Sequence, residues 1–155
     1  MSEAVTIRRG VPGDLEQVIA IAQQSEMAAQ WQAADYRAIF VTDRLLLVAE
    51  RGSRIAGFQV VHNIAGEWEL ENIAVTREQQ RQGIGAALLR ALVGAAESNA
   101  KFIFLEVRES NEVAKRVYER CGFQQYGRRS AYYSNPTEDA VLYRFLCNPE
   151  TREKC

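Results

Sequence analysis

Hydrophobic and polar positions follow a strand-like pattern in seven segments, either as a period of two or as an unbroken apolar run. These segments are residues 5–9, 45–50, 55–62, 68–75, 101–107, 123–133 and 140–147. Gly52 and Ser53 stand between the second and third segments, so we expect a hairpin there. The last two segments are also predicted to pair, joined by the turn-forming stretch SNPTED.

Apolar residues spaced three to four positions apart predict four helices. The first begins at residues 12–14, and the others cover residues 35–41, 84–99 and 111–121. The third carries the longest apolar stripe, and Gly122 is suited to end the fourth.

The order strand, helix, strand over residues 68–107 predicts a parallel βαβ unit, because its connections are short. The remaining strands favour antiparallel neighbours. We therefore predict an α/β (α+β) fold, with a mixed, mostly antiparallel sheet of about seven strands and about four helices on its two faces. Residues 1–147 are expected to form a single domain, followed by a flexible tail at 148–155.

Gly83 and Gly85 lie at the start of the third predicted helix, where each glycine costs about 0.5–1 kcal/mol relative to alanine. The free amides and the positive end of the helix dipole meet at this turn, which suits a phosphate group. A dinucleotide-binding loop would need a third glycine where Leu88 stands, and the Lys-Ser/Thr of a P-loop is absent. The alternative is that the glycines serve tight packing alone.

Composition narrows the class of protein. The chain has 155 residues, of which 47% are hydrophobic, and this content fits a globular domain rather than a disordered one. With 19 basic and 20 acidic residues, the net charge of -1 gives no reason to expect nucleic acid as a partner. The sequence contains no apolar run that would enter a membrane, and the three separate cysteines indicate a reduced, cytoplasmic protein without a metal site.

The segment Gln80-Arg81-Gln82-Gly83-Ile84-Gly85 resembles the acyl-CoA pyrophosphate loop of the GNAT superfamily of N-acetyltransferases, Gln/Arg-x-x-Gly-x-Gly/Ala. The resemblance extends from about Val5 to Phe145. The blocks NIAVTREQQRQGIGAALL, LEVRESNEVAKRVYERCGF, GRRSAYY and EDAVLY are similar to the RimI type, the ribosomal-protein-alanine N-acetyltransferases.

This resemblance implies the GNAT fold, acetyl-CoA as acetyl donor and CoA as product. It implies that the backbone of one strand holds the pantetheine arm and the thioester oxygen, and that the glycine loop holds the pyrophosphate. The implied cofactor-binding residues are Ile73, Ala74, Val75, Gln80, Arg81, Gln82, Gly83, Ile84, Gly85, Ala86 and Asn111. Asn111 is also predicted to cap the fourth helix, and the two roles are compatible.

Glu106 interrupts the apolar run FIFLEV, so its carboxylate needs a partner, solvent or a chemical role. A salt bridge to Arg108 is one explanation. The resemblance implies another, in which Glu106 is the general base that deprotonates the acceptor amine. Glu69 is the alternative base, since histone-acetylating relatives place theirs on the corresponding strand.

Tyr118 lies on the apolar stripe of the fourth predicted helix, where an aromatic residue usually belongs to the core. The resemblance places it where a tyrosine hydroxyl faces the sulfur of acyl-CoA as general acid. Both interpretations stay open at this point.

The acceptor site is implied by residues from several segments. Glu67, Glu69 and Glu71 alternate with apolar or amide residues, so they are expected on one face, where an acidic row would attract a positively charged N-terminus. The resemblance places Trp31, Tyr132 and Tyr133 around the acceptor. The implied acceptor-binding residues are Trp31, Glu69, Glu71, Tyr132 and Tyr133.

The tyrosines are equally explained by hairpin packing. The RimI-type motif Pro-Trp-Ser is replaced here by Gln30-Trp31-Gln32, which separates this chain from the family pattern at the specificity loop. His62 is expected to be structural.

The sequence thus predicts a cytoplasmic N-acetyltransferase, a monomer or weak dimer, that acts on a protein or peptide N-terminus by direct attack, with ribosomal protein as the target implied by the resemblance. Two alternatives remain. One is a GNAT enzyme for lysine side chains or small amines, and the other is a non-catalytic module that senses acyl-CoA.

Overall fold

The computed structural model describes residues 4–25 and 28–147, so the tail predicted at 148–155 lies outside the described residues. The strands are β1 (Val5–Arg9), β2 (Arg44–Arg51), β3 (Arg54–Ile64), β4 (Glu67–Val75), β5 (Phe102–Arg108), β6 (Gln124–Tyr133) and β7 (Glu138–Leu146). The helices are α1 (Leu15–Gln24), α2 (Ala33–Ala38), α3 (Ile84–Ala96) and α4 (Glu112–Arg120).

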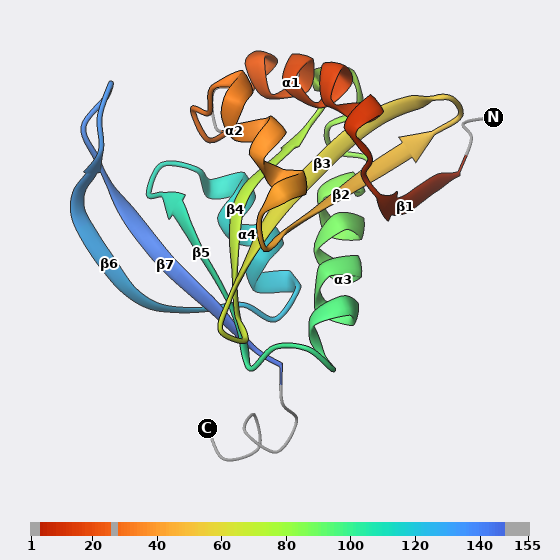
Figure 1. The fold of residues 1–155 in the computed structure, drawn as a ribbon. Helices are drawn as coiled ribbons and strands as arrows, with labels where there is room; N and C mark the ends of the chain where they lie inside the picture. Colours follow the sequence, from red (N-terminus) through yellow and green to blue (C-terminus); the bar gives the residue numbers. More distant parts are fainter. Residues whose placement is uncertain (1–3, 26–27, 148–155) are drawn as a thin grey trace.

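The seven strands form one sheet in the order β1-β2-β3-β4-β5-β7-β6 (Figure 1). Every neighbouring pair is antiparallel except β4 and β5, which are parallel and are connected through α3. The predicted mixed sheet with one βαβ unit is therefore confirmed.

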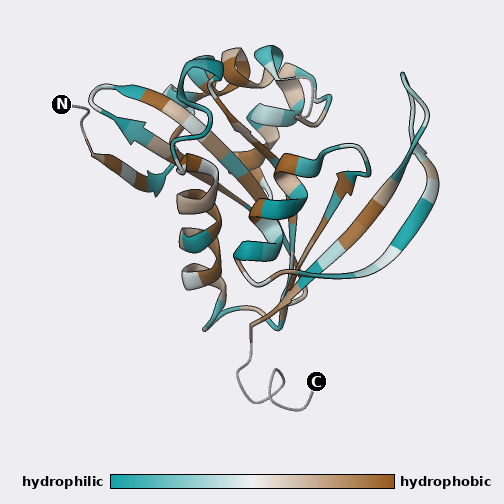
Figure 2. Ribbon diagram, turned by 180° about the vertical axis from the view of Figure 1, so that it is seen from behind, coloured by the Kyte–Doolittle hydropathy of each residue, from teal (hydrophilic) through white to brown (hydrophobic). Residues whose placement is uncertain are grey.

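Helices cover both faces of the sheet, as predicted. α1 and α2 pack over β2 and β3 on one face, where Tyr36, Ile39 and Phe58 share a buried cluster. α3 and α4 lie on the opposite face, which is turned to the viewer in Figure 2. There Leu89 and Leu92 of α3 pack with alternate residues of β5 in a second cluster.

Local sequence explains where several elements begin and end. The segment predicted as one helix at 35–41 is α2 followed by a 3-10 turn, Ile39–Val41. Asp14 lies in the turn before α1 and is buried, because Arg8 donates two hydrogen bonds of 2.9 Å to its carboxylate. This pair joins β1 to the start of α1.

β4 and β5 pair only over their first halves and then separate, as Figure 1 shows. Their register runs from Glu67 opposite Phe102 to Leu70 opposite Leu105. Directly after Leu70, β4 contains a β-bulge, since Val61 faces Leu70 and Val60 faces Asn72, which leaves Glu71 as the extra residue. The two strands therefore diverge at the point where Glu106 follows Leu105.

No helix within the described ranges has the length and apolar character needed to cross a membrane.

Candidate active site

A cavity of about 520 Å³ opens between the diverging ends of β4 and β5. We call it the β4–β5 cleft. Its lining combines residues of both strands with the start of α4, the chain before α2 and the end of β6. Nine residues predicted from the sequence line it together: Trp31, Glu69, Glu71, Ile73, Glu106, Asn111, Tyr118, Tyr132 and Tyr133.

Glu106 lies on β5 with 22% of its side chain exposed, and its carboxylate lies 3.4 Å from Arg129 Nε. The predicted salt bridge to Arg108 is wrong. Arg108 is held instead by the β6–β7 hairpin, where it pairs with Glu138 at 3.3 Å and donates to the carbonyls of Ser134 and Pro136. Glu106 instead lines the cleft.

Glu69 lies on the opposite wall of the cleft, on β4. Burial raises the pKa of its carboxyl above the ordinary value, and the negative charges of Glu71 and Glu106 raise it further. His62 and Arg129 partly oppose this shift. Glu71 on the same strand and Glu106 on the opposite strand thus both disfavour ionisation of Glu69.

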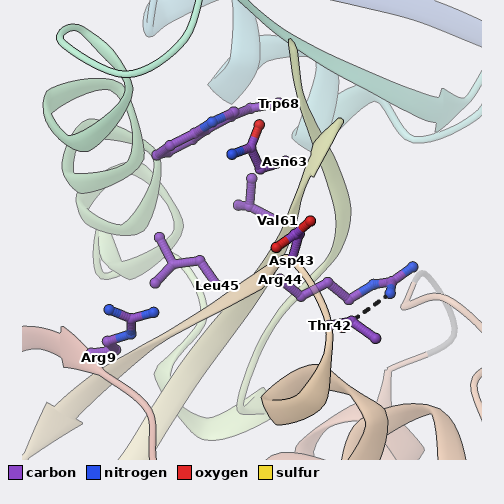
Figure 3. A pocket seen from close by; sticks show the side chains of 8 residues that line it. All are labelled: Arg9, Thr42, Asp43, Arg44, Leu45, Val61, Asn63 and Trp68. Atoms are coloured by element: carbon purple, nitrogen blue, oxygen red, sulfur yellow. Dashed lines mark hydrogen bonds between the residues drawn. The ribbon is translucent and has the colours of Figure 1, made fainter. Parts of the chain in front are cut away.

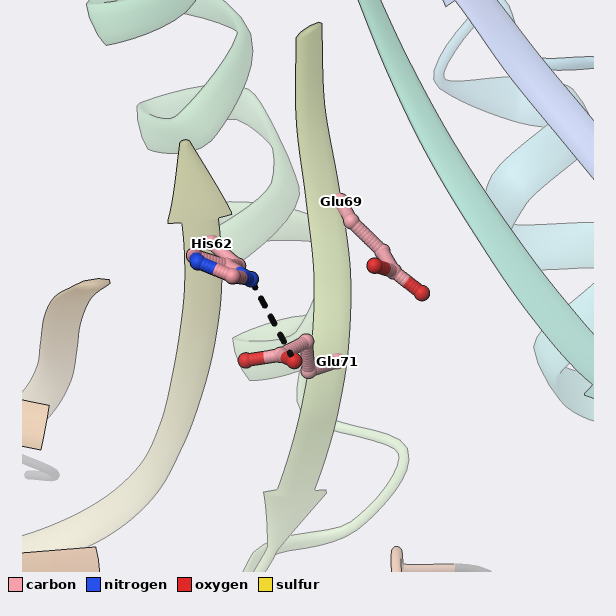
Figure 4. Close-up of side chains that lie close together, drawn as sticks. All are labelled: His62, Glu69 and Glu71. Carbon is pink, nitrogen blue, oxygen red and sulfur yellow. Dashed lines mark ion pairs between the residues drawn. The ribbon is translucent and has the colours of Figure 1, made fainter. Parts of the chain in front are cut away.

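Glu71, the bulge residue, is already paired. Arg44 Nε donates to its carboxylate at 2.6 Å, and His62 Nδ1 lies 3.8 Å from the second oxygen. Figure 4 shows Glu71 and His62 facing each other with Glu69 beside them, and one side-chain nitrogen or oxygen of each of the three lies within 4.8 Å of the others. The guanidinium of Arg44 thus supplies a positive charge to the carboxylate of Glu71.

Tyr118 lies on α4 and is 6% exposed. Its ring packs against Phe123 and Tyr143 with centroid distances of 5.9 and 6.1 Å, while its side chain also contributes to the cleft. The core and catalytic interpretations of Tyr118 are therefore compatible. Burial, and to a lesser degree Tyr133, raises the pKa of the phenol, which keeps it protonated and able to donate.

Asn111 caps α4 as predicted, since its Oδ1 accepts a hydrogen bond of 3.1 Å from the amide of Ala114. Because Asn111 also lines the cleft, the cap places the start of α4 beside the diverging strands.

Tyr132 and Tyr133 form the hairpin wall of the cleft, with their rings edge to face at 5.1 Å. Arg129 lies over Tyr132 at 5.5 Å and Arg108 over Tyr133 at 4.4 Å. Hydrogen bonding with Glu106 raises the pKa of Tyr132, and burial together with the charge of Glu106 raises that of Tyr133 to about 12. The sequence had indicated the tyrosines but not the pairing of Arg129 with Glu106.

The glycine turn lies outside the cleft lining, at the start of α3. Gly83 has φ +81°, a conformation that side chains disfavour, and no side chain caps the helix. A methyl group added at Gly83 or Gly85 would meet no atom within 4 Å. Tight packing therefore does not explain these glycines, whereas an open turn over uncapped helix amides fits a phosphate group.

Some side chains around this turn already form hydrogen bonds within the protein. Arg51 donates to Gln82 Oε1 at 2.6 Å, and Gln80 donates to the carbonyl of Val75 at 3.4 Å. Within the predicted loop, the backbone of residues 83–86 is thus the part best suited to meet an anion.

Asn72 lines the cleft and was not singled out from the sequence. A strict alternation would put Asn72 on the same face as Leu70, yet the bulge turns it to the α1–α2 face, where it contacts Ala29 and Tyr36. The available signal was an asparagine two positions from Leu70 and from Ala74, at a place where the alternation calls for another apolar residue.

A second cavity of about 320 Å³ lies on the face of α3, between Arg9, Leu45, Val61, Asn63 and Trp68 (Figure 3). None of the predicted site residues is among those that line it in the described structure.

The sequence pattern of the acetyltransferase (GNAT) family matches residues 15–123. A ribosomal protein bS18-alanine N-acetyltransferase of Escherichia coli is 37% identical over 59% of this chain, and the match spans 64% of that relative's length. The corresponding protein of Salmonella typhimurium is 30% identical, over 80% of this chain and 93% of its own. The crystal structure of the E. coli ribosomal-protein-S18-alanine N-acetyltransferase superposes with a TM-score of 0.84, at 29% identity, over 94% of this chain and 95% of that chain.

Proposed function

Because the chain belongs to the acetyltransferase (GNAT) family, we propose that it transfers an acetyl group from acetyl-CoA to the α-amino group of a protein N-terminus. One observation carries this proposal. The divergence of β4 and β5 gathers Glu106 and Tyr118 in one cleft, with aromatic residues at the entrance.

Glu106 is the general base in this proposal. An α-amino group has a pKa near 8, so most of it is protonated at neutral pH and must lose a proton before it attacks. The Glu106 carboxylate accepts that proton, directly or through a water molecule. Arg129 places a positive charge beside this carboxylate, at 3.4 Å from Nε to the nearer oxygen.

Tyr118 is the proposed general acid. Its hydroxyl donates a proton to the sulfur of the departing CoA thiolate, and its raised pKa keeps that proton in place until it is needed. The packing of its ring against Phe123 and Tyr143 fixes the direction of the hydroxyl. Glu69 remains the alternative base, since it faces the same cleft.

Acetyl-CoA supplies an activated acetyl thioester. The residues present fit it at two places. The start of α3 behind Gly83 suits the pyrophosphate. Within the described part of the chain, the β4 edge at Ile73, Ala74 and Val75 pairs with no strand on the β5 side, so its backbone groups suit the pantetheine amides and the thioester oxygen.

Two observations favour a peptide as the acceptor: what the similar proteins are named for, and the aromatic residues that line the cleft. The E. coli and Salmonella relatives are named for the alanine of ribosomal protein bS18. In this chain Trp31 lies on one side of the cleft and Tyr132 and Tyr133 on the other, which suits an extended peptide, and Glu69 offers negative charge to its ammonium group.

Mass spectrometry of a peptide panel tests the proposal. Peptides with varied first residues, matched peptides with a blocked N-terminus and an internal lysine, and a small amine are each incubated with the protein and acetyl-CoA. We expect acetylation at the α-amine of the unblocked peptides. Acetylation of lysine or of the small amine alone would contradict the proposed acceptor. Thiol release without any acetylated amine would contradict transfer altogether.

A further inference from the structure

The chain between α1 and α2 reaches the cleft through residues 28–31, and a buried amide fixes it there. Asn72 is 3% exposed. Its Oδ1 accepts a hydrogen bond of 3.1 Å from the amide of Ala29, and its Nδ2 donates one of 3.1 Å to the hydroxyl of Tyr36. One side chain on β4 thus holds both the loop and the helix that follows it.

Tyr36 extends this contact to Trp31. It is 2% exposed, and its ring lies 5.2 Å from that of Trp31 and, edge-on, 6.3 Å from that of Phe58. The amide of Trp31 also donates to the carbonyl of Ala29 at 2.9 Å. The position of Trp31 therefore depends on Asn72 through two routes, one along the backbone and one through Tyr36.

The β-bulge makes this arrangement possible. Because Glu71 is an extra residue, Asn72 points to the α1–α2 face, whereas Trp68 and Leu70 point to the α3 face. We propose that Asn72 and Tyr36 are positioning residues for the acceptor: they hold residues 28–31 as one wall of the cleft and so set the affinity for the acceptor, not for acetyl-CoA. This inference rests on the proposed function in placing the acceptor beside Trp31.

A buried hydrogen-bonding group that lacks a partner costs free energy. Residues 28–31 are therefore held in the position that lets the amide of Ala29 donate to Asn72. Acetyl-CoA is expected at the β4 edge and the start of α3. The side-chain hydrogen bonds of Asn72 go to Ala29 and Tyr36, which belong to the α1–α2 side of the cleft and not to either of these two places. The two binding steps should therefore respond differently when Asn72 is changed.

Steady-state kinetics of Asn72→Leu and Tyr36→Phe test this. We expect the KM for the acceptor peptide to rise about five- to tenfold in each variant, with the KM for acetyl-CoA and the calorimetric Kd for CoA unchanged within about twofold. Gln59→Leu is the matched control. Gln59 is also a fully buried amide, but it donates to the carbonyl of Leu88 in α3, so its loss should leave the acceptor KM unchanged.

Hydrogen exchange and a double-mutant cycle make the result decisive. In Asn72→Leu the amide hydrogen of Ala29 should exchange faster with solvent. In the double variant of Tyr36→Phe and Trp31→Ala, the fold increase in acceptor KM should be smaller than the product of the two single increases. A faster exchange at Ala29 with an unchanged acceptor KM would overturn the inference, as would equal increases in both KM values. If the wild-type protein acetylates only lysine or a small amine, the proposed acceptor is wrong, and the KM for that amine tests the positioning role independently.

Discussion

Replacement of Glu106 by glutamine separates a catalytic carboxylate from a structural one. The side chain keeps its shape and loses its basicity. The only ion pair that the structure gives Glu106 in the described residues is the one with Arg129, whose side chain is 57% exposed. Ion pairs of this kind contribute about 0–1 kcal/mol, which in a chain of this size corresponds to a shift of roughly 2–4 °C in the melting temperature at most.

The expected effect on the reaction is much larger. Loss of a general base lowers turnover by about 10²–10⁴-fold, which corresponds to about 3–5 kcal/mol of the activation barrier. The affinity for acetyl-CoA should stay nearly intact, because its predicted contacts are the β4 edge and the start of α3. A large loss of turnover with a small loss of stability is thus the signature of a base.

Thiol release and acetyl-peptide formation should be followed together in a single turnover, so that product release does not hide the chemical step. Calorimetry supplies the affinity for CoA, and a thermal melt supplies the stability. Glu69→Gln is the matched variant, since it removes the carboxylate of the same cleft that is the alternative base. If Glu69→Gln causes the loss and Glu106→Gln does not, the base is Glu69 and the assignment of Glu106 is refuted.

Three further predictions address the acid, the glycine turn and the fold. Tyr118→Phe removes one hydroxyl, so turnover should fall about 10²-fold or more while the protein stays folded; full activity with the chemical step rate-limiting would return Tyr118 to a purely structural role. Gly85→Val places a branched side chain over the start of α3, and calorimetry should show a strongly weakened affinity for CoA; an unchanged Kd would contradict the phosphate site. Hydrogen bonding from Arg8 lowers the pKa of Asp14 below 3.8, so its contribution to stability is present above that pH and is lost as the pH falls through the folded-state pKa. Asp14→Asn should therefore lower the free energy of unfolding by about 1–3 kcal/mol at pH 7, and denaturant titrations at successively lower pH should show a shrinking difference between the two proteins as the pH falls through the folded-state pKa.

The sequence predicted the fold well because its patterns are local. The period-two segments and helical stripes correspond to the observed strands and helices, and the short connections around α3 identified the parallel pair β4–β5. Asn111 was predicted as a cap because capping depends on a few neighbouring residues, and it does cap α4.

Features set by strand pairing were not predictable in the same way. The bulge at Glu71 depends on how β4 aligns with β3, so the alternation of residues 67–75 gave the wrong face for Asn72. The partner of Glu106 depends on the register of β6 and β7, which brings Arg129 to it and draws Arg108 to Glu138. Sequence proximity had favoured Arg108.

The half of the sheet formed by β1 to β4 meets the half formed by β5, β7 and β6 along a short seam, which is the β4–β5 pairing. β5 pairs with β7 along its whole length, from Phe102 to Arg108, whereas it pairs with β4 only as far as Leu105. Beneath this seam, Leu92 of α3 and Val107 of β5 belong to one buried cluster that also includes Tyr118. The angle between the two halves, and with it the width of the cleft, is therefore set by how this core is filled. Leu92 does not itself line the cleft, but it belongs to the same buried cluster as Leu105 and Tyr118, which do. A substitution such as Leu92→Val would therefore change the distance across which Glu106 faces β4, without altering any lining residue.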